Sequence, residues 1–485
     1  MMKHNLNESL LTVEQVIDAV GGEFVGDAEN RNLFCFTSVA TDSRNVIDGS
    51  LFVPLIGENE DGHRYCPQAV ENGAKVLFIS RGEFEKNSEY YKNLVTENKE
   101  MSVIVVENTL RALQNAAARY VSKFPTLVKI AITGSSGKTT SKDMVASILA
   151  RKYRVVATEG NFNSETGLPL SVFNIRHFHE VGVFEMGMNR KNEISEIAEI
   201  LKANFALITN IGTAHIGILG SIEDIAKEKK HVFDYVSYNG AAFVPDMDEF
   251  ADFLSSGIEG EVIRFGSSVP CSESGVKYLK DCGVEGTDFS VSDVKIHLAL
   301  PGIYNYVNAL GAVAVARRFG VLPSQIKKGL ECLNATSGRT EVKKVSAKNK
   351  SEITLIKDCY NANPSSMKSA LAFCSSLEKT GKLIYVLGDM LELGEKSSEL
   401  HESIGSIVAA DKPALAIFIG EEMKNAYDKA LKRGFENGVW FEKYDTDSIK
   451  KAAKIILDRL SDNDVVLLKA SRGICLERVA DEIIG

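Results

Sequence analysis

The chain has 485 residues, of which 44% are hydrophobic and 25% charged, a composition that is ordinary for a globular protein in water. At about 150 residues per domain, this length predicts roughly three domains. The 65 acidic residues outnumber the 56 Lys and Arg residues, and the net charge of −9 argues against nucleic-acid binding. The apolar stretches are too short for membrane insertion and the polar start lacks a signal-peptide core, so we expect a cytoplasmic protein.

Three blocks follow one another along the chain. Residues 1–107 begin with a capping box at Thr12 and Gln15 and mix short helices with β-rich runs, which predicts a small α/β domain. Residues 108–334 and 335–485 alternate apolar strands with helices, which predicts two parallel sheets covered on both faces, the second of them Rossmann-like. The expected strands of these two blocks are 128–133, 154–157, 181–185 and 206–209, then 353–356, 383–387, 414–419 and 465–468.

The strongest local signal is the segment TGSSGKTT at 133–140, between an apolar strand and a helix. Its glycines let backbone N–H groups surround a phosphate at the helix N-terminus. Lys138 would face the β- and γ-phosphates, and Thr139 would offer its hydroxyl to Mg²⁺. A chance Gly/Ser turn is the alternative, and Ile132 stands where the usual P-loop has its first glycine. The strand–loop–helix context favours nucleotide binding, and the expected contacts are Gly134, Ser135, Ser136, Gly137, Lys138, Thr139 and Thr140.

Two further residues follow apolar strands where parallel sheets bind ligands. Glu185 ends the run 181–185, and His215 follows the strand 205–209 after a short Gly-containing loop. A carboxylate at this edge can reach the Mg²⁺ of a phosphate loop, although Glu185 as a solvent-facing strand end is the alternative. A single histidine is more often structural than a metal ligand. His215 comes just after the carboxyl end of a parallel strand, and this position makes the metal-ligand and structural interpretations equally good.

A lysine on an apolar helical face is the third chemical signal. A helix is expected from the N-cap Ser221 to about Val236. At 100° per residue Lys229 lies in the middle of its apolar stripe, whereas Lys227 and Lys230 lie off it. A lysine on a buried face must extend to solvent, pair with an anion or change chemically.

Polar clusters also follow several expected strands. Each is compatible with an ordinary turn, but together they exceed what turns require. They lie at 160–163, 301–305, 337–339, 357–364, 388–390 and 469–472.

On these residues the chain resembles the Mur ligases, ATP-dependent amide-forming enzymes of peptidoglycan precursor synthesis, over nearly its whole length. The resemblance implies that 134–140 is a shortened nucleotide loop and that Thr139, Glu185 and His215 are magnesium ligands. It implies that Lys229 is carbamylated and binds a second Mg²⁺. It also implies that Asn305 and Asn308 lie near the adenine, and that the third domain brings Arg339 and Asp358 to the phosphates.

Within the family, four stretches resemble the member that adds D-alanyl-D-alanine to UDP-N-acetylmuramoyl-tripeptide: 158–169, 185–193, 358–367 and 388–394. The D-N-P-R signature of the ligases that add the diamino acid is absent. This likeness implies that ATP activates the tripeptide carboxylate as an acyl phosphate. We expect a monomer, although the sequence leaves the oligomeric state open. The likeness also implies that the first block binds uridine nucleotide, and the substrate-binding residues implied are Ser43, Arg44, Asn161, Asn163, Asn361 and Asn363.

Three other functions stay open. A sister Mur ligase would add a different amino acid. A P-loop kinase or NTP-driven switch would leave Lys229 and the third block unexplained. A nucleotide-binding scaffold without activity would have no use for Lys138, Glu185, His215 and Lys229 together.

Overall fold

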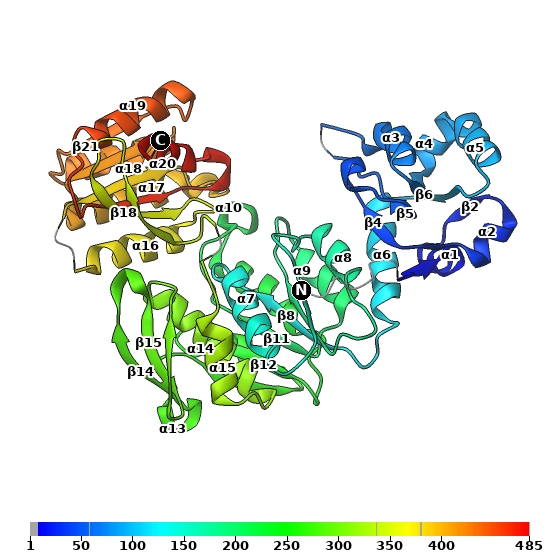
Figure 1. Cartoon of the computed structure of the whole chain (residues 1–485), viewed down its shortest axis with the longest axis horizontal. Helices are drawn as coiled ribbons and strands as arrows, with labels where there is room; N and C mark the ends of the chain where they lie inside the picture. Colours follow the sequence, from blue (N-terminus) through cyan, green and yellow to red (C-terminus); the bar gives the residue numbers. More distant parts are fainter. Residues whose placement is uncertain (1–7, 58, 336, 379–380, 485) are drawn as a thin grey trace.

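The computed structural model describes residues 8–57, 59–335, 337–378 and 381–484. Three lobes follow one another along the chain, and each is built around its own sheet (Figure 1). The predicted α/β class with parallel sheets is therefore confirmed. The polar start at 1–7 lies outside the described residues, and no described helix is long and apolar enough to cross a membrane.

The first lobe opens with the predicted capping box. The Thr12 hydroxyl accepts the N–H of Gln15, the Gln15 side chain accepts the N–H of Thr12, and the helix ends at Gly21 with φ of 66°. The sheet has one antiparallel edge strand, β2, which the sequence did not predict. Its order is β2 (Glu23–Gly26), β7 (Ser102–Val106), β6 (Ala74–Ser80), β5 (Ser50–Phe52) and β4 (Ser38–Ala40). The other elements are β1 (Leu11–Thr12), β3 (Cys35–Phe36), α1 (Val13–Val20), α2 (Ala28–Leu33), α3 (Cys66–Glu71), α4 (Arg81–Lys86) and α5 (Ser88–Glu97).

The central sheet is parallel throughout. Its order is β13 (Glu261–Phe265), β12 (Ala241–Pro245), β11 (Phe205–Ile208), β8 (Val128–Thr133), β10 (Val181–Glu185) and β9 (Val155–Ala157). Ile130 and Ile132 pack in one core with α7 (Lys138–Leu149) and α14 (Ile303–Arg318). Ala131 belongs to the core on the other face, with α6 (Thr109–Val121), α8 (Gly167–Val172) and α9 (Glu193–Leu201). The four strands predicted for this block are present, and β12 and β13 extend the sheet.

Smaller elements complete the central lobe. A three-stranded antiparallel sheet that the sequence did not predict comprises β14 (Val276–Asp281), β15 (Thr287–Val291) and β16 (Val294–Leu298). The remaining helices are α10 (Ile216–Leu219), α11 (Ile222–Lys230), α12 (Ala251–Ser255), α13 (Cys271–Ser274) and α15 (Pro323–Glu331). The expectation that α11 would run to Val236 is wrong. The chain tightens into a 3-10 turn at His231–Phe233, which keeps Val232 and Phe233 buried.

The third lobe is doubly wound, as predicted. Its sheet order is β17 (Glu341–Ser346), β18 (Glu352–Asp358), β22 (Val465–Lys469), β19 (Leu383–Gly388), β20 (Leu415–Ile419) and β21 (Gly438–Phe441). Only the edge strand β17 is antiparallel to its neighbour. The helices are α16 (Pro364–Ser376), α17 (Ser397–Asp411), α18 (Met423–Lys432), α19 (Thr446–Leu457) and α20 (Glu477–Ile484).

Candidate active site

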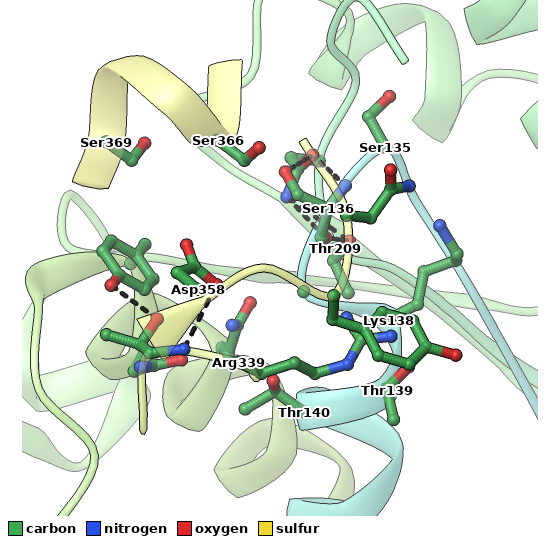
Figure 2. Close-up of a pocket in the computed structure, with 18 of the residues that line it drawn as sticks. Ser135, Ser136, Lys138, Thr139, Thr140, Thr209, Arg339, Asp358, Ser366 and Ser369 are labelled. Atoms are coloured by element: carbon green, nitrogen blue, oxygen red, sulfur yellow. Dashed lines mark hydrogen bonds between the residues drawn. The ribbon is translucent and has the colours of Figure 1, made fainter. Parts of the chain in front are cut away.

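A cavity of about 540 Å³ is lined by residues of both the central and the third lobe. The start of α7 and the carboxyl ends of β10 and β11 form one side, and the carboxyl ends of β18 and β22 with the loop after β18 form the other. Figure 2 shows Lys138 from the first side and Asp358 from the second. Carboxyl ends of parallel strands are where open α/β sheets bind ligands. The cavity therefore joins the ligand edges of two such sheets.

The phosphate loop, residues 134–140, is held by the residues that follow β11. The Thr209 hydroxyl donates to the carbonyl of Ser136 at 2.6 Å, and the Asn210 amide accepts the Ser136 N–H at 3.1 Å (Figure 2). Gly134 has φ of 153°, and a Cβ there would overlap the Thr209 hydroxyl. Gly137 has φ of 78°, and its Cβ would lie 2.5 Å from the Asn308 side chain. The loop conformation therefore depends on glycine at both places.

Lys138 stands at the start of α7, and its Nζ donates to the carbonyl of Gly134 at 3.0 Å. It forms no ion pair within the described part of the chain. Burial lowers the pKa of its ammonium, and the charge of Arg339 acts in the same direction while Glu185 opposes it. Two cations thus lie close to a helix N-terminus, an arrangement that favours a bound polyphosphate.

Glu185 is 1% exposed and ends β10 beside the phosphate loop. Its Oε1 accepts from the Asn163 amide at 2.6 Å, and its backbone N–H donates to Thr158. Its Oε2 is buried and has no hydrogen-bond partner among the described residues. Burying a carboxylate oxygen without a partner is costly, so this atom fits a divalent cation in the cavity.

His215 lines the same cavity and precedes α10 with φ of 65°, a left-handed conformation. Its side chain is 15% exposed. Its Nδ1 lies 2.8 Å from Oε2 of Glu392 in the third lobe, at ion-pair distance but without the alignment of a hydrogen bond. The imidazole is therefore held between the cavity and a carboxylate of the other lobe.

Lys229 is buried, as its place in the apolar stripe of α11 predicted, with 1% of the residue exposed. That burial excludes an ammonium that extends to solvent. No described residue forms a hydrogen bond or ion pair with its side-chain amine. Burial, followed by the charge of Lys138, lowers its pKa well below the ordinary value. Lys229 lies outside the wall of the cavity, but its amine is close enough to Lys138 for the two charges to repel each other.

The third lobe contributes Arg339 and Asp358. The Arg339 guanidinium lies 3.9 Å from the centre of the Tyr360 ring and extends toward Lys138 and Thr139 (Figure 2). Its Nε is buried and has no hydrogen-bond partner among the described residues. Asp358 accepts the Thr340 N–H at 3.1 Å and faces the cavity. Arg339 is a cation whose Nε–H is not engaged by the described residues, and it lies opposite the phosphate loop. It therefore suits a negatively charged ligand between the lobes.

The other predicted residues divide into two groups. The first lines the cavity and comprises Ser135, Ser136, Thr140, Asn161, Asn163, Asn305, Asn308, Asn361 and Asn363. Ser43 and Arg44 lie in the first lobe, away from the cavity. The Ser43 hydroxyl donates to Gln68, and Arg44 pairs with Asp42 while its side chain stays 80% exposed.

The sequence placed Tyr360 and Lys469 in polar clusters without giving either a role, and it did not select Asn210, although all three line the cavity. Asn210 follows β11 directly, and Lys469 is the last residue of β22. The rule that ligands bind at the carboxyl ends of parallel strands points to both residues. The role of Tyr360 as a platform for Arg339 had no signal in the sequence, because it depends on the fold of the loop after β18.

Family models match most of the chain. The Mur ligase middle domain matches residues 132–316, the Mur ligase glutamate ligase domain matches 338–472, and the model described as the Mur ligase family catalytic domain matches 36–121. A curated relative in Treponema pallidum, named UDP-N-acetylmuramoyl-tripeptide–D-alanyl-D-alanine ligase, is 39% identical over 97% of this chain and 98% of its own length.

Solved structures agree with these matches. The fold is similar to MurF from Acinetobacter baumannii, with a TM-score of 0.82, 27% identity and coverage of 99% of both chains. It is also similar to the MurF ligase from Thermotoga maritima in complex with ADP, with a TM-score of 0.75, 26% identity and coverage of 92% of this chain and 96% of that one. The cavity, the phosphate loop and these matches lead to one conclusion: this chain belongs to the Mur ligase family.

Proposed function

We propose that the protein is an ATP-dependent ligase that joins D-alanyl-D-alanine to UDP-N-acetylmuramoyl-tripeptide in the cytoplasmic stage of peptidoglycan synthesis. The observation that carries the proposal is the cavity in which the phosphate loop of the central lobe faces Arg339 and Asp358 of the third. The full-length relative in Treponema pallidum, whose name states this reaction, favours it over a sister ligase. A kinase or switch would not account for the third lobe or for Lys229. A monomer is part of the same proposal.

The proposed chemistry has two steps. The terminal carboxylate of the tripeptide attacks the γ-phosphorus of ATP, so that ADP leaves and an acyl phosphate remains. The amine of the dipeptide then attacks the acyl carbon, phosphate leaves with the bridging oxygen, and the nitrogen loses a proton. Lys138 and Arg339 would hold the phosphates and stabilise the charge that develops on the transferred group. Asn305 and Asn308 would lie near the adenine.

Magnesium belongs to this proposal because the donors suit it. The unpartnered Oε2 of Glu185 and the Thr139 hydroxyl at the start of α7 are oxygen ligands of the kind Mg²⁺ prefers, and His215 lines the same cavity. When bound, two Mg²⁺ ions would offset the repulsion between a carboxylate and a triphosphate.

We further propose that Lys229 is carbamylated. Its neutral amine would add to the carbon of CO₂ and lose one proton, leaving a carbamate anion. Only the neutral amine reacts, and burial together with the charge of Lys138 makes that form available. The carbamate would turn the repulsion between Lys229 and Lys138 into attraction and would offer oxygens to the second Mg²⁺.

The domain assignments complete the proposal. Residues 1–107 would bind the uridine nucleotide through Ser43 and Arg44, residues 108–334 would bind ATP, and residues 335–485 would close on the phosphates. Asn161, Asn163, Asn361 and Asn363 would contact the peptide substrates, because they line the cavity from both lobes. Closure of the third lobe would exclude water from the acyl phosphate.

Mass spectrometry of the product tests this function. The enzyme is incubated with ATP, Mg²⁺, D-alanyl-D-alanine and a UDP-N-acetylmuramoyl-tripeptide that ends in either lysine or diaminopimelate. The expected product is heavier than one of these tripeptides by the dipeptide minus one water. Product with a different amino acid, and none with the dipeptide, would instead identify a sister ligase.

A further inference from the structure

The segment after β19 touches the segment around α10, so that the third lobe rests on the central lobe beside His215 (Figure 1). We call residues 392–394 and 215–217 the docking contact. Within it, the Gly217 N–H donates to the carbonyl of Glu392 at 3.2 Å, and the Glu392 carboxylate reaches His215. Next to it, Lys396 donates to the carbonyl of Gly220 at 3.4 Å. Backbone and side-chain contacts thus cross between the lobes at one place.

The docking contact is sterically tight because two glycines meet in it. A Cβ on Gly217 would overlap the backbone nitrogen of Gly394, and a Cβ on Gly394 would lie 2.8 Å from Cα of Gly217. The two backbones are therefore packed directly against each other. Glu392 itself has φ of 64°, a left-handed backbone conformation. Backbone packing between the lobes consequently fixes where the Glu392 carboxylate lies relative to His215.

The contact also has a chemical consequence for the imidazole. A carboxylate at Nδ1 favours a proton on that nitrogen, which leaves Nε2 as the atom with a free lone pair. His215 lines the cavity, so Nε2 is the nitrogen available to a metal ion there. In metal sites, a carboxylate that accepts the second ring N–H of a histidine fixes the orientation of the ring and makes it a stronger ligand, and Glu392 lies within that distance of Nδ1.

We propose that Glu392 is a positioning residue for His215, and that docking of the third lobe therefore completes the metal site of the central lobe. The proposal rests on the proposed metal role of His215. On this proposal, a metal ion bound beside the nucleotide stabilises the docked arrangement of the third lobe, and docking of the third lobe stabilises the bound metal ion. Each raises the affinity for the other, because a coupling between two binding events is reciprocal.

Mn²⁺, which is detected directly by electron paramagnetic resonance, is a suitable probe in place of Mg²⁺ for the full-length protein saturated with ADP. Loss of a residue that supports a metal ligand typically weakens metal binding about 10- to 100-fold, and we expect this loss for Glu392→Ala. Glu392→Gln keeps an acceptor oxygen but not the charge, so it should lose less. Glu395→Ala, an exposed neighbour with no hydrogen bond or ion pair to His215 among the described residues, is the matched control and should bind Mn²⁺ like the wild type.

Two further variants separate positioning from a general loss of structure. Gly217→Ala should weaken Mn²⁺ binding as Glu392→Ala does, because its Cβ would push Gly394 away. Glu392→Ala should have no further effect in a His215→Ala background, since it acts through that side chain. Circular dichroism of each variant checks that the fold is retained.

The outcomes distinguish the two claims. Wild-type Mn²⁺ affinity in folded Glu392→Ala, or additive losses in the double variant, would overturn the positioning role while leaving the function proposed above intact. Wild-type Mn²⁺ affinity in His215→Ala would overturn the metal role of His215, and the positioning role with it. A loss in His215→Ala and Glu392→Ala that is not additive supports both.

Discussion

The Lys469 ammonium and the Asp358 carboxylate form an ion pair, with 2.5 Å between Nζ and Oδ2, in the wall of the cavity. The two residues are register partners at the carboxyl ends of the neighbouring strands β18 and β22. Lys469 is 1% exposed, whereas 15% of the Asp358 side chain is exposed on the cavity side. The lysine therefore compensates the charge of a carboxylate that faces the ligand.

We expect Lys469→Met to lower the free energy of unfolding by about 3 kcal/mol, because removing one partner of a buried pair leaves the other charge uncompensated. Thermal unfolding followed by circular dichroism measures the effect. Lys451→Met is the control, since it removes the exposed pair with Asp447 and should change stability little. Equal changes in the free energy of unfolding for the two substitutions would show that the Lys469–Asp358 pair stabilises the fold no more than an exposed ion pair does.

Gly134→Ala should disable nucleotide use, because its Cβ would overlap the Thr209 hydroxyl that holds the phosphate loop. A displacement of about 1 Å in a reacting site costs on the order of 100-fold in kcat/KM, and we expect a loss of that size. Calorimetric titration with ADP and steady-state kinetics measure it. Gly82→Ala, whose Cβ meets open space, should match the wild type.

Lys229→Ala should lose most activity, because it removes the amine that would carry the carbamate. Short carboxylic acids added to this variant should restore part of the activity by supplying an anion at the vacated place. Lys227→Ala is the matched control on the same helix, where Lys227 is exposed and pairs with Asp224. Full activity of Lys229→Ala without added acid would contradict the carbamate.

Arg44→Ala should raise the KM for the UDP-linked tripeptide, because it removes a cation proposed to bind the uridine nucleotide. ADP binding should stay unchanged, because the first lobe contributes no described residue to the cavity wall. Arg64→Ala removes another exposed arginine of this lobe, which pairs with Glu60, and serves as its control. Weaker ADP binding by Arg44→Ala, or an unchanged KM, would contradict the uridine assignment.

Local signals in the sequence predicted the elements that position the site. The phosphate loop lies between β8 and α7 as expected, since glycine conformations and an apolar strand are properties of a short segment. The burial of Lys229 followed from helical periodicity alone, even though the helix ends earlier than predicted. The strand β14 was not predicted because only Val276 at its start is buried, so its residues show no apolar alternation.

Contacts between distant segments were beyond such signals. The Lys469–Asp358 pair exists because β22 lies between β18 and β19, an order that the alternation of strands and helices does not specify. The contact between His215 and Glu392 requires the third lobe to rest on α10. Ser43 and Arg44 were assigned to the uridine-binding block through the resemblance to the family, but no pattern in the sequence specified how far they lie from the cavity.

The most direct test of the central claim follows an oxygen atom from substrate to product. The terminal carboxylate of the UDP-linked tripeptide is labelled with ¹⁸O, and the reaction is run with ATP, Mg²⁺ and D-alanyl-D-alanine. If the carboxylate is activated as an acyl phosphate, one ¹⁸O leaves with each phosphate released, and mass spectrometry of the phosphate will show it. Release of unlabelled phosphate during amide formation would contradict the account.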